Sequence, residues 1–155
     1  VAASGNNNAA VGYPAAYDDY VIAVGATRYN ETRAPYSNYG SSLDIVAPGG
    51  DLGLDQNGDG YSDGVLQQTF NPNTKRTSDF GYWFFNGTSM ASPHVAAVAA
   101  LVIAHGNATT PADVRAALES TADDLGVAGR DDQFGYGIVN ALRALGWSTT
   151  TPPAP

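Results

Sequence analysis

Short apolar runs bounded by turn-forming residues make up much of the chain, and one long apolar run stands out among them. Tyr20–Ala26 and Leu43–Ala47 are short runs rich in Val, Ile and Ala. Continuous apolar runs of this length predict strands that are buried on both faces, as in a parallel sheet. The long run predicts a helix from Ser89 to Ala104 that is apolar nearly all round and therefore buried, and His105-Gly106 ends it.

Alternation and capping signals predict the remaining elements. Gly64–Phe70 and Gly81–Phe85 both resemble strands, and the polar stretch between them predicts a hairpin with a long, exposed tip. Thr110, followed three residues later by Asp113, predicts a helix that starts in the manner of a capping box. Ile138–Leu145 predicts a third helix.

Composition limits the partners of the chain. With 155 residues, of which 43% are hydrophobic and 14% are charged, the chain is long enough for about one compact domain. The net charge of −8 argues against nucleic acid and anionic membrane surfaces, because nothing neutralises phosphates. No apolar run reaches the ~18 to 20 residues that span a bilayer. We therefore expect neither a nucleic-acid nor a membrane partner.

The two ends of the chain differ from the rest. Val1-Ala2-Ala3 reads as the end of a buried strand without its beginning, so we expect the chain to be a piece of a longer protein. Residues 147–155 are rich in Thr and Pro, which predicts a linker or tail. The predicted domain therefore covers residues 1–146.

The start of the long helix carries candidate chemistry in the sequence NGTSMASPHV, from Asn86 to Val95. Gly87 allows close approach of a backbone or a substrate, and Pro93 is tolerated early in a helix. Ser89 would lie at the positive end of the helix dipole, beside N–H groups that have no intrahelical partner and could hold an oxyanion. The alternative is that Thr88 and Ser89 are only N-cap residues.

This motif closely resembles the nucleophile motif of subtilisin-like serine proteases, the subtilase family. VAASGN near the start, GYP at residues 12–14, DIVAPG at residues 44–49 and FGYGIVNA at residues 134–141 resemble the same family. The resemblance implies an α/β fold, namely the C-terminal half of a three-layer catalytic domain with a mostly parallel sheet and a buried central helix. It also implies a serine endopeptidase that is secreted or extracellular and acts on polypeptide substrates.

The resemblance assigns roles to individual residues. Ser89 matches the nucleophile, and Asn6 matches the asparagine of the oxyanion hole, whose amide stays neutral and can donate to a developing alkoxide. Gly12 matches the base of the primary specificity pocket, although glycine is also a common turn residue. One wall of this pocket would be formed by Ala3, Ser4 and Gly5. A deep, mostly apolar pocket implies a large hydrophobic or aromatic side chain before the scissile bond.

A serine needs a base, and neither histidine of the chain fits that role. In the family the base is a histidine oriented by an aspartate, and both precede the oxyanion asparagine, so we expect both outside this chain. On a helix, His94 would lie about 140° round the axis and about 7.5 Å along it from Ser89. His105 would lie about 24 Å away. The chain alone is therefore expected to be inactive, and its predicted partner is the missing N-terminal half of its own domain.

A calcium loop is predicted between residues 55 and 64, which read DQNGDGYSDG. Oxygen ligands at alternate positions, with Gly60 at the sharp turn, have the spacing of an EF-hand-type loop. The twelfth position is Leu66 instead of a bidentate Glu, so Asp51, Asp79 or water would supply the missing oxygen. The alternative is an acidic turn without metal. The candidate ligands of this structural calcium ion are Asp55, Asn57, Asp59, the Tyr61 carbonyl and Asp63.

Two other functions remain open from the sequence. A calcium-stabilised binding module with a protease-like fold would also lack the Asp and the His, but it would have no need of Ser89 together with Asn6. An esterase of the α/β-hydrolase type needs a G-x-S-x-G elbow. The residues around the serine read GTSMA, so the second glycine is absent.

Overall fold

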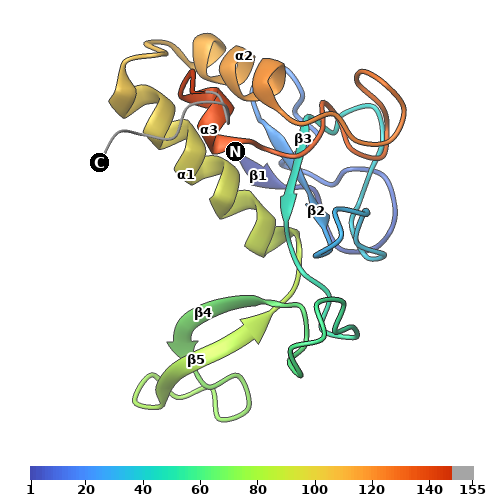
Figure 1. Cartoon of the computed structure of the whole chain (residues 1–155), viewed down its shortest axis with the longest axis vertical. Helices are drawn as coiled ribbons and strands as arrows, with labels where there is room; N and C mark the ends of the chain where they lie inside the picture. Colours follow the sequence, from blue (N-terminus) through green and yellow to red (C-terminus); the bar gives the residue numbers. More distant parts are fainter. Residues whose placement is uncertain (148–155) are drawn as a thin grey trace.

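The computed structural model describes residues 1–147 and shows a parallel sheet covered by helices, with a separate hairpin (Figure 1). Apart from Trp147, the predicted linker 147–155 lies outside the described residues. The elements are β1 (Ala2–Ala3), β2 (Ala23–Thr27), β3 (Ile45–Pro48), β4 (Val65–Phe70), β5 (Phe80–Phe85), α1 (Thr88–His105), α2 (Pro111–Thr121) and α3 (Ala141–Ala144).

The three-stranded sheet has the order β1-β2-β3 and all its pairs are parallel, as the apolar runs predict. Every residue of β2 is buried, and Val24 stands opposite Ile45 in β3. β2 begins later than the predicted Tyr20, because the N–H groups of Tyr20 and Val21 both donate to the Tyr17 carbonyl and close a turn there. The central strand is thus preceded by a turn that delivers it into the core.

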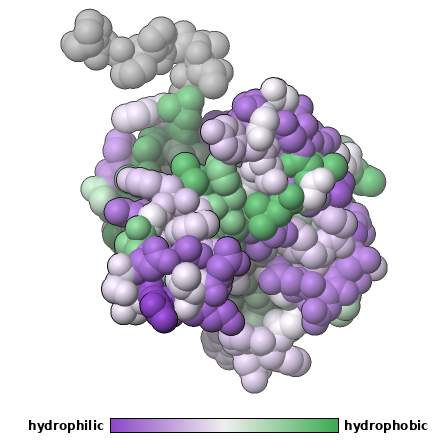
Figure 2. All heavy atoms as spheres, turned by 90° about the horizontal axis from the view of Figure 1, so that it is seen from below, coloured by the Kyte–Doolittle hydropathy of each residue, from purple (hydrophilic) through white to green (hydrophobic). Residues whose placement is uncertain are grey.

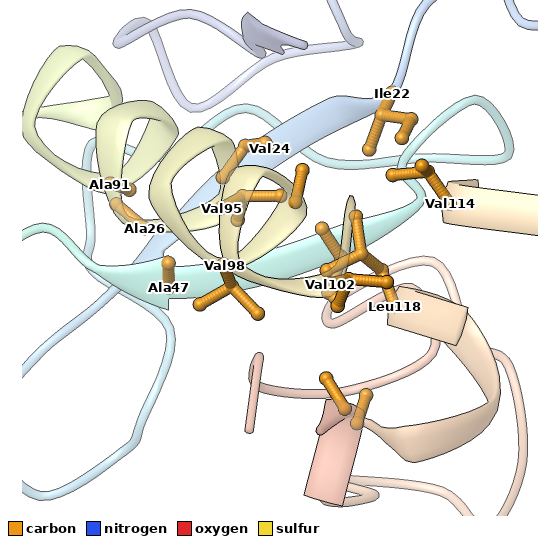
Figure 3. Close-up of a cluster of buried hydrophobic side chains, with 14 of the residues drawn as sticks. Ile22, Val24, Ala26, Ala47, Ala91, Val95, Val98, Val102, Val114 and Leu118 are labelled. Carbon is orange, nitrogen blue, oxygen red and sulfur yellow. The ribbon is translucent and has the colours of Figure 1, made fainter. Parts of the chain in front are cut away.

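One face of α1 packs on the sheet. Ala91, Val95, Val98 and Val102 lie on the side of α1 that faces β2 and β3 (Figure 3). A helix start at Gly87 and a left-handed Gly106 at the end agree with the predicted glycine stop.

The prediction that α1 is buried all round is wrong for the described residues. Leu101 is 49% exposed and Ile103 is 56% exposed. The physical reason is that the sheet, α2 and α3 all pack against the same side of the helix, and no described element covers the other. By length and composition α1 could also span a membrane, but a helix of a protein core passes the same test. The expectation of no membrane partner therefore stays a prediction.

The C-terminal helices agree with the sequence in part. α2 begins with the predicted capping box, since Thr110 Oγ1 accepts from the Asp113 N–H at 3.2 Å and the Asp113 carboxylate accepts from the Thr110 N–H at 3.0 Å. α3 is shorter than predicted. Ile138 pairs with Asp123 and with Val46 as extended backbone, and Asn140 caps the helix that follows. The residues predicted to form the first turn of this helix are therefore extended and paired with other segments.

The hairpin of β4 and β5 stands apart from the body of the molecule and leads directly into α1 (Figure 1). Its strands are antiparallel, with Leu66 opposite Phe84 and Phe70 opposite Phe80, which confirms the predicted hairpin. The view from below shows apolar side chains gathered in a band across that face (Figure 2). Leu66 and Phe80 of the hairpin are both exposed. The hairpin therefore carries exposed apolar side chains both near the start of α1, at Leu66, and near its tip, at Phe80.

Candidate active site

Ser89 is the second residue of α1 and is exposed. The helix N-cap is Gly87, which has a φ of 147° and provides no side-chain cap. Its carbonyl accepts the Met90 N–H at 2.9 Å and its own N–H donates to the Gly49 carbonyl at 2.9 Å. Thr88 and Ser89 are therefore not N-cap residues in the structure. The Ser89 N–H is a first-turn donor for which the helix has no carbonyl four residues back, and it takes part in none of the hydrogen bonds among residues 1–147.

Asn6 is joined to the residue directly before Ser89. The Asn6 Oδ1 atom accepts from the backbone N–H and from the hydroxyl of Thr88, at 2.9 Å in both cases. The Thr88 Oγ1 atom accepts in turn from the Gly5 N–H at 3.3 Å. Because the amide oxygen is occupied, the amide NH₂ is the free end, and it takes part in none of the hydrogen bonds among residues 1–147. The structure thus brings Asn6 and Ser89 together across more than 80 residues of sequence.

A groove of about 290 Å³ lies beside the serine. Ser89, Met90, Pro93 and His94 of α1 form one side, and residues 65–67 of β4 form the other. The hairpin is therefore a wall of the space in front of the candidate nucleophile.

The predicted specificity-pocket residues lie close to each other. Gly12 donates its N–H to the Ser4 carbonyl at 2.9 Å, directly after β1. Ser4 is fully buried, whereas Ala3, Gly5 and Gly12 are partly exposed. Since Gly5 also bonds to Thr88, this segment lies beside the start of α1. The contact of these residues with a substrate stays a prediction.

Neither histidine is positioned as a base for Ser89. His94 Nδ1 lies 2.8 Å from the Met90 carbonyl oxygen, one helical turn back. His105 Nδ1 lies 3.1 Å from the Asn107 side-chain oxygen at the far end of α1. Among residues 1–147, Ser89 therefore has no hydrogen-bonded base.

Tyr36 supports the turn before Ser89, and none of the sequence motifs described above includes it. Its hydroxyl donates to the Gly50 carbonyl at 2.7 Å. Burial raises the pKa of Tyr36 to about 12, so the hydroxyl stays a neutral donor at ordinary pH. A Cβ atom on Gly49 would lie 2.9 Å from the Gly87 carbonyl oxygen and 3.0 Å from the Tyr36 hydroxyl. Glycine at position 49 therefore lets β3 approach the turn that presents Ser89.

The loop predicted to bind calcium is closed by its own backbone. The Asp55 carboxylate accepts from the N–H groups of residues 58, 59 and 60, at 2.8, 3.2 and 3.0 Å. The Asp59 carboxylate accepts from the Tyr61 N–H at 2.8 Å and from the Asn57 amide at 3.0 Å, and Asp63 accepts from the Gln56 N–H at 2.5 Å. Within residues 1–147 no three acidic or histidine side chains are placed to share a metal ion. The metal assignment stays a prediction.

The two acids considered for the missing ligand position lie in different places. Asp51 pairs with Asp63 through its backbone N–H at 2.8 Å, but its carboxylate is bound to Arg28 at 2.8 Å. Asp79 accepts from the Thr74 hydroxyl at 2.8 Å, in the tip of the hairpin. Of these two, Asp51 is the neighbour of the loop.

Comparison with known proteins agrees with the geometry. The sequence profile described as the subtilase family matches residues 1–137. The chain belongs to the subtilase family. Alkaline elastase YaB of Bacillus sp. (strain YaB) is 46% identical over 145 residues, which cover 93% of this chain and 32% of that protein. Subtilisin Savinase of Lederbergia lenta is 41% identical over 145 residues, which cover 93% of this chain and 45% of that protein.

Solved structures of two proteases have the same fold over the matched region. A protease from Pseudoalteromonas arctica PAMC 21717 matches with a TM-score of 0.78 at 36% identity, covering 93% of this chain and 41% of that one. A lanthipeptide protease matches with a TM-score of 0.76 at 32% identity, covering 92% of this chain and 50% of that one. The fold is therefore the predicted subtilisin-like α/β fold with a parallel sheet. The chain spans about a third to a half of the length of these relatives.

Proposed function

We propose that the protein containing this chain is a serine endopeptidase with Ser89 as its nucleophile. The Ser89 oxygen attacks the scissile carbonyl carbon while a base takes its proton, and the acyl-enzyme forms as the leaving amine receives a proton. The Asn6 amide and the Ser89 N–H donate to the oxyanion of the tetrahedral intermediate. The observation that carries this proposal is the pair of hydrogen bonds from Thr88, the residue before the serine, to the Asn6 oxygen, which leaves the amide NH₂ without an acceptor among residues 1–147.

The base would come from a polypeptide segment outside these residues. Support comes from the two histidines of the chain, since neither is bonded to Ser89. The same segment would cover the apolar side of α1, where Leu101 and Ile103 are exposed, and the free edge of β1, which pairs only with β2 among the described strands. Apolar surface and unpaired strand edges of this kind are normally covered in a finished fold. The 155 residues alone are then inactive.

The proposed substrates are polypeptides with a large apolar side chain before the scissile bond. Gly12 has no side chain to fill the pocket, and Ala3, Ser4 and Gly5 form its wall.

Location and metal binding are proposed as well. An extracellular location is proposed from the resemblance, and a calcium ion in the loop 55–63 would have a structural role. A Tyr61 carbonyl and three carboxylates at alternate positions suit a hard cation.

A fluorophosphonate probe tests the proposal on the full-length protein. We expect covalent labelling of Ser89 and hydrolysis of a peptide substrate, and loss of both in Ser89→Ala. The matched control is Ser120→Ala, because Ser120 is an exposed serine of α2 whose hydroxyl only donates to the Ala116 carbonyl. If the folded, full-length protein is not labelled, the alternative of a non-catalytic, calcium-stabilised binding module is favoured.

A further inference from the structure

Asn38 is a buried asparagine whose side chain is fully used by the loop that contains Asn6. It is 4% exposed. Its Nδ2 group donates to the carbonyl oxygens of Ser4 and Ala10, at 3.1 and 2.9 Å. Its Oδ1 atom accepts from the N–H groups of residues 7 and 9, at 2.9 and 3.1 Å. One amide side chain therefore holds the backbone on both sides of Asn6.

The backbone of Asn38 is bound to the same loop. Its N–H donates to the Gly5 carbonyl at 2.9 Å, and its carbonyl accepts from the Ser4 hydroxyl at 3.2 Å. Gly5 has a φ of 111°, and a Cβ atom there would lie 2.4 Å from Asn38 Nδ2. Gly5 and the Asn38 side chain are thus so close that only glycine fits at position 5.

Asn38 is itself held by the central sheet. The preceding residue, Ser37, is fully buried, and its hydroxyl accepts from the Ala26 N–H of β2 at 2.9 Å. By contrast, residues 6–10 are exposed and belong to no strand or helix. The loop therefore takes its fixed geometry from hydrogen bonds rather than from packing of its own side chains. Asn38 and Thr88 supply the side-chain bonds, and the backbone of Tyr36 and Tyr39 bonds to residues 8 and 9.

We propose that Asn38 is a positioning residue for the oxyanion hole, which sets the backbone of residues 4–10 so that the Asn6 amide faces the carbonyl attacked by Ser89. The inference rests on the proposed protease function. An amide suits the position because two carbonyls and two N–H groups must be paired at once, and only Asn or Gln offers two donors and an acceptor oxygen in one neutral group. Removing it takes the hydrogen-bond partner from the Ala10 carbonyl and from the N–H groups of residues 7 and 9, whereas the Ser4 carbonyl keeps its bond from Gly12. Misplacement of a catalytic donor by about 1 Å can cost up to about 100-fold in rate.

The test compares Asn38→Ala and Asn38→Asp in the full-length protease, with turnover counted per site titrated by a fluorophosphonate. Asn38→Asp keeps the acceptor for residues 7 and 9 but loses both donors. We expect kcat to fall about 10-fold to 100-fold, with a smaller change in KM. The matched control is Asn140→Ala, because Asn140 also links two segments by side-chain hydrogen bonds, to Asp123 and Arg143, and should leave kcat unchanged.

A double-mutant cycle separates positioning from a merely structural role. If Asn38 acts through Asn6, then Asn38→Ala adds little further loss of kcat in an Asn6→Ala background. An equal loss in both backgrounds would overturn the proposal, as would unchanged turnover per titrated site in both Asn38 variants.

Hydrogen exchange gives a second test. In the wild-type protein, the amide hydrogens of residues 7 and 9 should exchange slowly although these residues are exposed. Exchange at the rate of a free loop would also overturn it. Absence of turnover in the wild type would instead refute the proposed function.

Discussion

The side-chain oxygen of Asn6 accepts two hydrogen bonds from Thr88, one from the backbone and one from the hydroxyl, each 2.9 Å long. This pair decides which end of the Asn6 amide is free. Thr88 is fully buried and its hydroxyl also accepts from Gly5. The orientation of the amide is therefore set by a residue that neighbours Ser89 in the chain but lies 82 positions from Asn6.

Removing the Asn6 amide should lower turnover more than substrate binding. Asn6→Ala is expected to reduce kcat by about 100-fold to 1,000-fold with little change in KM, which is the size of loss known for this donor in a subtilisin. Asn6→Asp keeps the acceptor for Thr88 but removes the donor, so its kcat should be equally low. Steady-state kinetics of the full-length protein measure both. A kcat of Asn6→Asp close to the wild-type value would show that the donor is not used.

Changing Thr88 should affect catalysis through the orientation of Asn6. Thr88→Val has nearly the same shape but loses the hydroxyl, so we expect kcat to fall by about 10-fold, the equivalent of about 1 to 1.5 kcal/mol for one hydrogen bond. Thr88→Ser keeps the hydroxyl and serves as the control, with kcat near the wild-type value. Steady-state kinetics of the two variants measure the difference. Equal kcat values for Thr88→Val and Thr88→Ser would show that the hydroxyl does not contribute to catalysis.

The ion pair of Asp44 and Arg115 should contribute to stability. Arg115 contacts the Asp44 carboxylate at 2.5 Å and also donates to the carbonyls of Asp18 and Val21, both at 2.9 Å. It thus ties α2 to the turn before β2. Asp44 is nearly buried, so Arg115→Met should lower the free energy of unfolding by about 3 kcal/mol, measured by denaturant titration. The control Arg143→Met breaks an exposed pair with Asp123 and should cost less than about 1 kcal/mol.

The pH dependence of the Arg115 variant has a defined sign. Burial raises the pKa of Asp44 above its ordinary value, although the Ala23 N–H and Arg115 lower it. The folded protein therefore keeps a proton at Asp44 where the unfolded chain has lost it, and the free energy of unfolding falls as pH rises through this window. In Arg115→Met the pKa of Asp44 should rise further, because the nearby positive charge is lost. The fall in the free energy of unfolding should therefore extend to higher pH. Thermal midpoints measured from about pH 3 upward test this, and identical pH profiles would contradict it.

Calcium should stabilise the protein if the loop 55–63 binds it. The expected result is a higher thermal midpoint with calcium than with a chelator, since a ligand at about 100 times its Kd stabilises by about 2.7 kcal/mol. Asp59→Asn should reduce this difference. Asp132→Asn changes an exposed carboxylate outside the loop and should leave the difference unchanged. The same midpoint with calcium and with chelator in the wild-type protein would rule out a stabilising metal.

Several elements of the fold follow directly from local pattern. The short runs that become β2 and β3, the glycine stop of α1 and the Thr110 capping box of α2 depend on burial and backbone chemistry within a few residues. α3 begins later than its local pattern predicts, because Ile138 is drawn into pairing with Asp123 and Val46, which are distant in sequence. Pairing between remote segments overrides a helical pattern when it satisfies the same backbone groups.

The amino-acid sequence by itself determined the family resemblance and the candidate pair Ser89 and Asn6, because both residues lie in short, specific motifs. The tertiary structure alone decided that Thr88 orients the Asn6 amide and that Asn38 holds the loop on either side of it. It also decided that α1 keeps one apolar side exposed within residues 1–147. The physical reason is that residue type and periodicity report what a side chain can do locally, whereas the partners of a buried amide are fixed only when distant segments meet.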